Sequence, residues 1–323
     1  MQKILKKSLQ IIALAVPMTL VGVGSLQANT IEQNPTAQTQ DWSRYITSDR
    51  LNALMQRNNG VQIIDIRSKK YVKKGMIPGA VWMPFADWRG PKERPGQPPT
   101  EEELEAMLGA NGLRLDQPIV VHNQSGKTLS TGRAAIVYWI LKSSGADNIA
   151  ILNGGFKAWQ SAELPEAITP ITPAPIDVDL TIRRDWWADP VHIFGVASSQ
   201  SKGAILDARL EMQVKKSAKT GKPLQSMPMA QYISASFFIN QLSTSQLSAS
   251  GQDKFVEALE ARGIQLDDGF LISVCQTGEL SALSWFYASE IVGLENVLYY
   301  PDALQGWRSD GGLMFGLNTE TGS

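Results

Sequence analysis

The sequence predicts an α/β protein made of two similar units, each a parallel sheet with helices on both faces. Short apolar runs rich in β-branched residues alternate with longer segments of helical periodicity, which is the pattern of a parallel sheet. The segment from Tyr138 to Trp159 aligns without a gap with the segment from Phe286 to Trp307, so the chain is an internal duplication. A proline-rich stretch at residues 161–184 is expected to be a stiff linker between the units.

The first 28 residues have the charged, apolar and small-residue regions of a secretory signal peptide. Lys3, Lys6 and Lys7 precede an apolar run from Ile11 to Val23, and small residues follow up to Ala28. The run contains a proline and is shorter than the ~20 residues that a membrane-spanning helix needs. We therefore expect cleavage after Ala28, a periplasmic or secreted location and no stable membrane anchor. An uncleaved anchor is the alternative.

Composition narrows the class of protein. Without residues 1–28 the chain has 27 basic and 31 acidic side chains, a net charge of −4, which gives no indication of nucleic-acid binding. Residues 29–40 are polar and are expected to be a flexible leader. The remaining length suffices for two domains, at residues 41–160 and 185–323. One cysteine excludes an intrachain disulfide, and one cysteine with two histidines argues against a metal site.

The first unit shows the alternation clearly, since buried strands follow helices with recognisable caps and stops. The expected elements are, in chain order, a helix capped by Ser48 and stopped at Asn58 to Gly60, a strand at 61–67, a helix at 101–108, a strand at 118–123, a helix ending at Gly145 and a strand at 149–152.

The second unit begins near Asp185 and repeats this pattern. Residues 204–209 match the strand at 63–67 and share its Asp-x-Arg ending, here Asp207 and Arg209. A strand from Phe270 to Val274 then ends at Cys275, and an amphipathic helix starts at Glu279 after a short polar loop. The Asp-x-Arg strand is expected to neighbour the cysteine strand.

Cys275 is the candidate nucleophile. Cysteine reacts as the thiolate, and the unpaired N–H groups and dipole of a helix N-terminus favour that anion, so we expect a lowered pKa. The alternative is a small buried hydrophobe that ends a core strand. Catalysis requires that the sulfur lie at the mouth of a pocket between the two units, open to solvent.

The loop Cys-Gln-Thr-Gly-Glu-Leu-Ser-Ala, which begins at Cys275, resembles the active-site loop of rhodanese-like sulfurtransferases. The segment 74–81 resembles the family's Gly-His-Ile-Pro-Gly-Ala sequence, with Met76 in place of histidine, and residues 153–159 follow its Gly-Gly and Trp pattern. The resemblance implies two tandem rhodanese-like domains and a sulfurtransferase that needs no cofactor. A thioredoxin-like or glutathione-type reductant is a further implied partner.

The duplication indicates which unit carries the chemistry. Anchoring the strand ends places Asn123 opposite Cys275, and the first loop is expected to carry four extra residues. An amide cannot replace a thiolate, so we expect an inactive N-terminal domain at 41–160 and a catalytic C-terminal domain at 185–323. Tandem members of the family are commonly built this way, as the resemblance implies.

The expected reaction is a ping-pong transfer. The Cys275 thiolate attacks the sulfane sulfur of a donor such as thiosulfate or 3-mercaptopyruvate, holds it as a persulfide and passes it to cyanide or a thiol. Backbone N–H groups of the loop would cradle the charged sulfur. The residues expected to form this loop are Gln276, Thr277, Gly278, Glu279, Leu280 and Ser281.

Several residues depart from the family's pattern. The pair Asp207 and Arg209 resembles residues that support the loop, but Gln213 stands where a further arginine is usual. Glu279 is acidic where thiosulfate-specific members have basic side chains, so an anionic donor would receive less help. A non-catalytic sulfane carrier or binding module therefore stays as the alternative. A cysteine phosphatase needs arginine at the position of Ser281 and is discounted.

Overall fold

The computed structural model describes residues 42–57, 60–91, 96–219, 221, 224–243, 249–264 and 269–317. The predicted signal peptide and leader at residues 1–40 lie outside these residues and remain predictions. No helix in the described part of the chain has the length and apolar character needed to cross a membrane.

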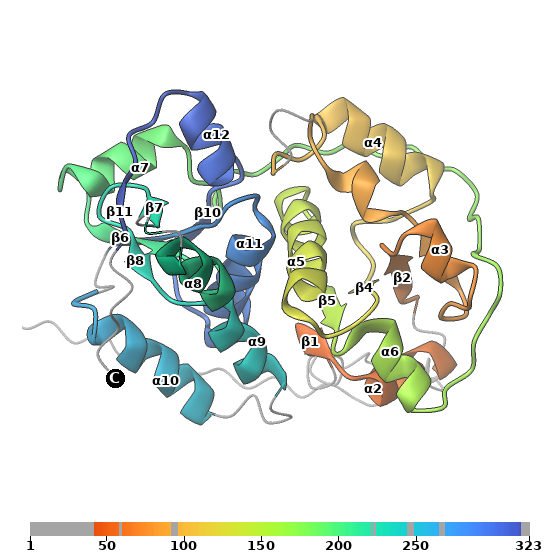
Figure 1. Cartoon of the computed structure of the whole chain (residues 1–323). Helices are drawn as coiled ribbons and strands as arrows, with labels where there is room; N and C mark the ends of the chain where they lie inside the picture. Colours follow the sequence, from red (N-terminus) through yellow and green to blue (C-terminus); the bar gives the residue numbers. More distant parts are fainter. Residues whose placement is uncertain are drawn as a thin grey trace, which may run out of the picture. The chain divides into compact units, whose positions relative to one another are not determined.

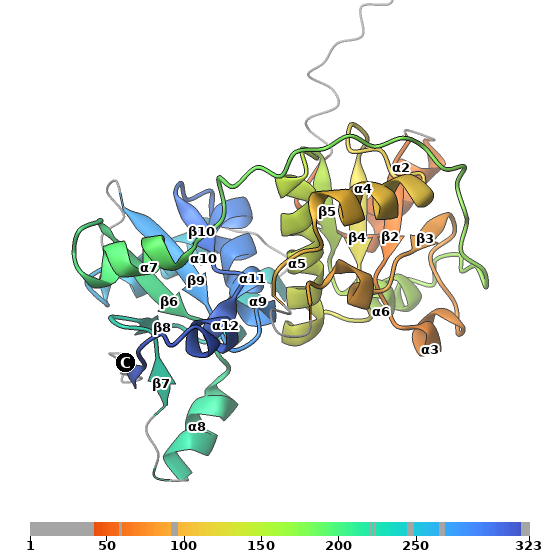
Figure 2. The same cartoon turned by 90° about the horizontal axis from the view of Figure 1, so that it is seen from above.

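The first module is a five-stranded parallel sheet with helices on both faces (Figures 1 and 2), as predicted. Its strand order is β1-β5-β4-β2-β3. The elements are β1 (Tyr45–Ile46), α2 (Ser48–Gln56), β2 (Gln62–Asp65), α3 (Lys69–Val72), β3 (Ala80–Trp82), η1 (Phe85–Trp88), α4 (Glu101–Ala110), β4 (Ile119–His122), α5 (Thr128–Ser143), β5 (Ile149–Leu152) and α6 (Gly155–Ser161).

The second module has a four-stranded parallel sheet in the order β10-β9-β6-β8 and a small antiparallel pair, β11 with β7. Its elements are α7 (Pro190–Ala197), β6 (Gly203–Asp207), α8 (Glu211–Lys219), β7 (Gln225–Ser226), β8 (Gln231–Tyr232), α9 (Ala235–Ser243), α10 (Ala249–Glu260), β9 (Phe270–Val274), α11 (Glu279–Trp285), the π-helical turn η2 (Phe286–Val292), β10 (Val297–Tyr299), α12 (Ala303–Ser309) and β11 (Phe315–Gly316).

Alternation along the strands assigns each side chain to one of two cores. In the first module Ile63 and Val120 pack with α2 and α6, whereas Ile64 and Val121 face α4 and α5. The second module repeats this division, with α7 and α12 on one face and α9, α10 and α11 on the other. Both faces of each sheet are thereby buried, as a parallel sheet requires.

The duplication extends to individual hydrogen bonds. Trp159 in α6 donates its indole N–H to the carbonyl of Pro165 at 2.8 Å, and Trp307 in α12 donates to the carbonyl of Leu313 at 2.9 Å, six residues on in each case. The backbone of Asn123 accepts from Phe156, and that of Cys275 accepts from Leu304. The two closing halves therefore fold alike, and Asn123 occupies the position of Cys275.

One capping residue differs from the expectations. Thr47, rather than Ser48, caps α2, because its hydroxyl accepts from the Arg50 N–H at 3.3 Å while Ser48 is already helical. The linker is also bound to the first module along its length. Its backbone pairs with Met76 through Ala167 and with Ala80 through Ile171, so it does not act as a free spacer.

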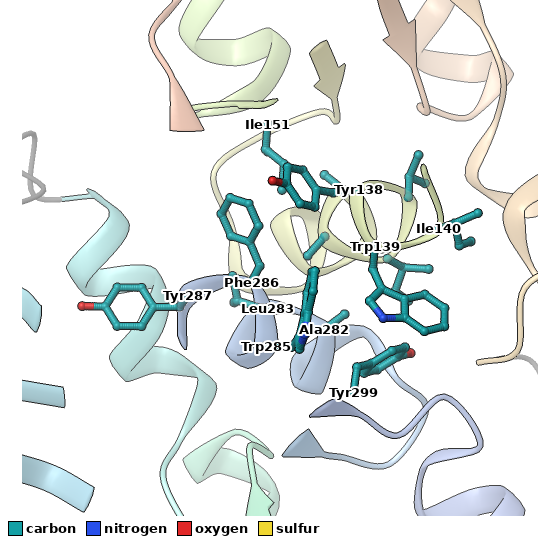
Figure 3. Packing of buried hydrophobic residues seen from close by; sticks show 14 of the residues in the cluster. Tyr138, Trp139, Ile140, Ile151, Ala282, Leu283, Trp285, Phe286, Tyr287 and Tyr299 are labelled. Atoms are coloured by element: carbon teal, nitrogen blue, oxygen red, sulfur yellow. The ribbon is translucent and has the colours of Figure 1, made fainter. Parts of the chain in front are cut away.

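Helix α5 joins the two modules. Eleven of its sixteen residues are buried, so it is apolar around most of its circumference, as a helix between two packed layers must be. Its outer side packs on α11 and on Phe286 at the start of η2 (Figure 3), with the rings of Tyr138 and Phe286 edge-on at 5.0 Å between centroids. At the rim, Glu290 accepts from the Tyr138 hydroxyl at 2.6 Å and pairs with Lys142 at 3.0 Å.

We predict that Phe286→Ala lowers the free energy of unfolding by about 3–5 kcal/mol, because it removes a buried ring from the core that both modules share. Urea unfolding followed by fluorescence and circular dichroism measures the change. The control Leu313→Ala, at a side chain 70% exposed, should stay within about 0.5 kcal/mol of wild type. A decrease of less than about 1 kcal/mol in the free energy of unfolding of Phe286→Ala would contradict a core shared by the two modules.

Candidate active site

Cys275 lies at the carboxyl end of β9, between β10 and β6 in the second sheet. Ligand sites of open parallel sheets lie at this edge, where strands end and helices begin. In the register of β6 with β9, Asp207 is the partner of Val274. The Asp-x-Arg strand therefore neighbours the cysteine strand, as predicted.

The loop from Cys275 to Gly278 curls so that donors point at the sulfur. The Gly278 N–H donates to Sγ at 3.2 Å, and the Ser281 hydroxyl lies 3.3 Å from Sγ and 3.0 Å from the Gly278 carbonyl. The Ser281 hydroxyl has one proton and can donate it to only one of these acceptors at a time. When the sulfur is ionised, the hydroxyl can donate its hydrogen bond to the sulfur instead of to the carbonyl. Ser281 thus takes part in the cradle at the position where a phosphatase would have its arginine.

Gly278 must be glycine for two reasons. Its φ of +102° is a conformation that residues with a Cβ rarely adopt. A Cβ at this position would also lie 2.5 Å from the hydroxyl oxygen of Tyr299. The residue therefore permits both the curl of the loop and the close approach of the β10 side chain.

The sulfur is buried, which corrects two expectations. Cys275 is 1% exposed, so the predicted solvent-open sulfur is wrong for this conformation. Burial raises the pKa of the Cys275 thiol, and the Ser281 hydroxyl and the main chain at Ser281 and Thr277 lower it, whereas the Glu279 charge adds a smaller increase. The pKa is raised overall because desolvation of the thiolate outweighs the hydrogen bonds and the helix dipole.

Glu279 places a negative charge beside Cys275, and the sequence indicated no partner for it. Its carboxylate pairs with Arg89 of the first module at 2.9 Å and accepts from the Thr277 hydroxyl at 2.6 Å. The Arg89 guanidinium also lies 5.2 Å from the centroid of the Phe85 ring. Sequence reasoning missed Arg89, because nothing in the sequence links it to a residue 190 positions away.

The first module also contacts the second near this loop at three further points. Gln97 donates its amide to Asp302 at 2.9 Å. Gly96 lies against Pro301 so closely that a Cβ at Gly96 would overlap the Pro301 carbonyl oxygen. On α5, the Gly132 backbone approaches the Glu279 carbonyl in the same manner. These contacts place the first module against the turn after β10 and the start of α11, which both lie next to the cysteine loop.

Asp207 and Arg209 form a buried ion pair, with the guanidinium 2.7 Å from the carboxylate. Arg209 also donates to the Gln225 carbonyl at 2.8 Å, and the Ser226 hydroxyl donates to Asp207 at 2.6 Å. In the part of the chain described, the hydrogen bonds that these two side chains make to other residues go to β7 rather than to the cysteine loop. Their supporting role remains a prediction. Asp65 and Arg67 make the same pair at 2.6 Å in the first module, so the motif fixes strand ends in both.

The corresponding loop of the first module differs less than predicted. It has five residues, 123–127, between β4 and α5, against four, 275–278, between β9 and α11. The expectation of four extra residues in this loop is therefore wrong, since the loop has one extra residue and the other three lie in the helix before Tyr138, which aligns with Phe286.

Gln213, which stands where an arginine was expected, accepts from the Leu210 N–H at 2.9 Å and so caps its own turn. Neither histidine supports a metal. His122 is fully buried beside Asp65, and burial lowers its pKa, while His192 caps α7 with Asp189. Among the residues described, no three of His, Cys, Asp and Glu converge on a point that could hold a metal ion.

Comparison with known proteins relates this arrangement to one family. Residues 47–162 match the rhodanese-like domain family. A Haloferax volcanii protein provisionally named a thiosulfate sulfurtransferase is 26% identical over 64% of this chain and 72% of its own length. The 3-mercaptopyruvate sulfurtransferase of Escherichia coli is 30% identical over 35% of this chain and 41% of its own length, so the chain spans less than half of that relative.

A solved structure extends the likeness to the second module. The crystal structure of SseA from Escherichia coli, described as a 3-mercaptopyruvate sulfotransferase, matches 81% of this chain and 98% of its own chain with a TM-score of 0.66. The sequence identity is 17%, so this likeness concerns the fold.

We predict that Cys275 makes the protein less stable in mild alkali. The fold raises the pKa of the thiol, so above about pH 8.5 the unfolded chain loses the proton first and the free energy of unfolding falls as the pH rises. Urea unfolding from pH 7 to 9.5 should show a steeper fall for wild type than for Cys275→Ser. A wild-type stability that instead rose relative to the variant between pH 6 and 8 would mean a lowered pKa.

We also predict that Glu279→Gln makes Cys275 more reactive. Loss of the carboxylate removes a charge that raises the thiol pKa and leaves the Arg89 charge in place. The rate of alkylation by neutral iodoacetamide at pH 7.5 should rise about two- to tenfold. Glu290→Gln also removes an acid from the contact between the modules, so an equal increase in that control would show that opening, rather than charge, controls the rate.

Proposed function

The chain belongs to the rhodanese-like family of sulfurtransferases, and we propose that it moves a sulfane sulfur from a donor such as thiosulfate or 3-mercaptopyruvate to cyanide or a thiol through a persulfide on Cys275. One observation carries this proposal. The sole cysteine ends a central strand, and both a main-chain N–H and a hydroxyl aim at its sulfur. Such a cradle supports an anionic sulfur more than a buried thiol of purely structural use.

The proposed reaction has two steps. The Cys275 thiolate attacks the outer sulfur of the donor, a sulfur–sulfur bond forms, and the donor's remaining group leaves with the electron pair of the broken bond. An acceptor then attacks the outer sulfur of the persulfide, and the Cys275 thiolate leaves. The Gly278 N–H and the Ser281 hydroxyl, which contact Sγ, would stabilise the negative charge on this sulfur at the start and the end of the cycle.

Donors of this kind are anions, and the ion pair across the modules supports their binding. Glu279 would repel an anion if it stood alone beside the cysteine. Its charge is balanced by Arg89, which is held against Phe85 and contributes one side chain from the first module to the site of the second. The acidic loop therefore does not argue against an anionic donor, as it did from sequence alone.

A second function is favoured by the burial of the sulfur. A protein that holds a sulfane sulfur without turnover benefits from a thiol that water and other thiols do not reach, and Cys275 is 1% exposed with a raised pKa. Turnover, by contrast, requires that the contacts of Arg89, Gly96 and Gln97 with the second module open for each substrate.

We predict that Cys275→Ser lowers thiocyanate formation from cyanide by about a thousandfold or more, with either thiosulfate or 3-mercaptopyruvate as donor. Intact-mass spectrometry should find one added sulfur on wild type and none on the variant. A variant that retains full activity would exclude the Cys275 persulfide.

The same measurements separate the two functions. An enzyme forms the adduct and turns over many times per cysteine, whereas a carrier forms the adduct and releases at most one sulfur per molecule. Wild-type protein that neither gains the sulfur nor makes thiocyanate would contradict both.

A further inference from the structure

Tyr299 is the last residue of β10, and it is completely buried. Its hydroxyl has no hydrogen-bond partner among the residues described. A buried hydroxyl without a partner costs free energy that a phenylalanine at the same place would avoid, so its presence requires an explanation. Residues that reduce stability in this way are concentrated at functional sites.

The ring of Tyr299 is held by both modules. It packs edge-on against Trp139 of α5 at 4.9 Å between centroids. Its backbone bridges to the segment at Trp187, with the Tyr299 N–H donating to the Trp186 carbonyl at 2.9 Å and the Ala188 N–H donating to the Tyr299 carbonyl. The ring therefore cannot turn outward to place the hydroxyl in water, and the position of the hydroxyl is fixed.

The hydroxyl points at the cysteine loop. A Cβ on Gly278 would lie 2.5 Å from the Tyr299 oxygen, and the N–H of the same Gly278 is 3.2 Å from Sγ. Burial raises the Tyr299 pKa well above its ordinary value, and the charges of Cys275, Glu279 and Asp302 raise it further against a smaller opposing effect of Arg89. The phenol thus keeps its proton at any physiological pH, which makes it a hydrogen-bond donor beside an anionic sulfur.

We propose that Tyr299 is a further catalytic residue, whose hydroxyl donates a hydrogen bond to the outer sulfur of the Cys275 persulfide. This inference rests on the proposed function. In the loading step the outer sulfur becomes bonded to Sγ as its bond to the donor breaks, and it retains a negative charge. The neutral Tyr299 hydroxyl stabilises that charge without transferring its proton, and charge stabilisation by a donor that is already positioned is a large term in catalysis.

The substitution Tyr299→Phe separates this role from simple packing. It keeps the ring and removes only the hydroxyl, so the free energy of unfolding should be unchanged or higher. We expect single-turnover loading of Cys275 by thiosulfate, followed by intact mass, to slow by about ten- to a hundredfold. Tyr300→Phe is the matched control, because it removes a buried hydroxyl from the next residue, which faces the other core, and should leave loading unchanged.

A second measurement does not depend on enzymatic loading. The persulfide is installed on Cys275 with inorganic polysulfide, and its alkylation by iodoacetamide is followed against pH. If Tyr299 donates to the outer sulfur, the midpoint of this profile should rise by about half a unit or more in Tyr299→Phe and stay constant in Tyr300→Phe.

The outcomes distinguish the two proposals. A wild-type protein that takes sulfur from polysulfide but not from thiosulfate or 3-mercaptopyruvate would contradict the proposed function, while the pH profile would still decide the role of Tyr299. Identical profiles and loading rates in wild type and Tyr299→Phe would overturn the role of Tyr299 and leave the proposed function standing. A cysteine that accepts no sulfur even from polysulfide would overturn both.

Discussion

The packing of α5 against α11 is the contact on which the rest of this structure depends. It merges one core of the first module with one core of the second, so that a single apolar cluster extends through both. The same contact sets the distance at which Arg89 meets Glu279 and at which Gly132 meets the helix that follows the cysteine. The first module thereby contacts the helix that follows Cys275, a residue that it does not supply.

Two opposing effects act on the Cys275 sulfur. The loop brings an N–H and a hydroxyl to it, which favours the thiolate, whereas burial of the side chain removes the water that would favour it more. Desolvation is the larger effect, since the pKa of the thiol is raised overall. Exclusion of water also strengthens each hydrogen bond to the sulfur once the sulfur is charged. The burial that raises the thiol pKa therefore supports the proposed chemistry after the persulfide has formed.

The two modules show which parts of the motif belong to the scaffold and which to the site. The Asp-x-Arg pair and the tryptophan that closes each unit make nearly the same hydrogen bonds in both, at Asp65 and Trp159 as at Asp207 and Trp307. Because the first module keeps these hydrogen bonds although its loop has Asn123 in place of the cysteine, they serve the fold. The difference between the modules is concentrated at the loop, where Asn123 stands in one and Cys275 in the other.

The sequence by itself determined the alternation of strands and helices, the duplication, and the position of Cys275 between a central strand and a helix. These features follow from periodicity and local chemistry, which neighbours in the chain decide. The sequence did not distinguish Thr47 from Ser48 as the capping residue of α2, because the hydroxyl of either residue can accept from the first N–H groups of a helix. The sequence showed that the first module has four more residues than the second between the end of the central strand and the aligned helix. How these residues divide between loop and helix depends on the packing of the helix.

Only the tertiary structure decided the state of the sulfur. The ion pair of Arg89 with Glu279, the approach of Tyr299 to Gly278 and the burial of Cys275 each join segments that are distant in the chain. The pKa of a thiol depends on the solvent and charge around it in space, and only the folded chain shows that Cys275 is buried beside Ser281 and Glu279. The chain sequence thus placed Cys275 between a central strand and a helix, and the tertiary structure determined its burial and its neighbours.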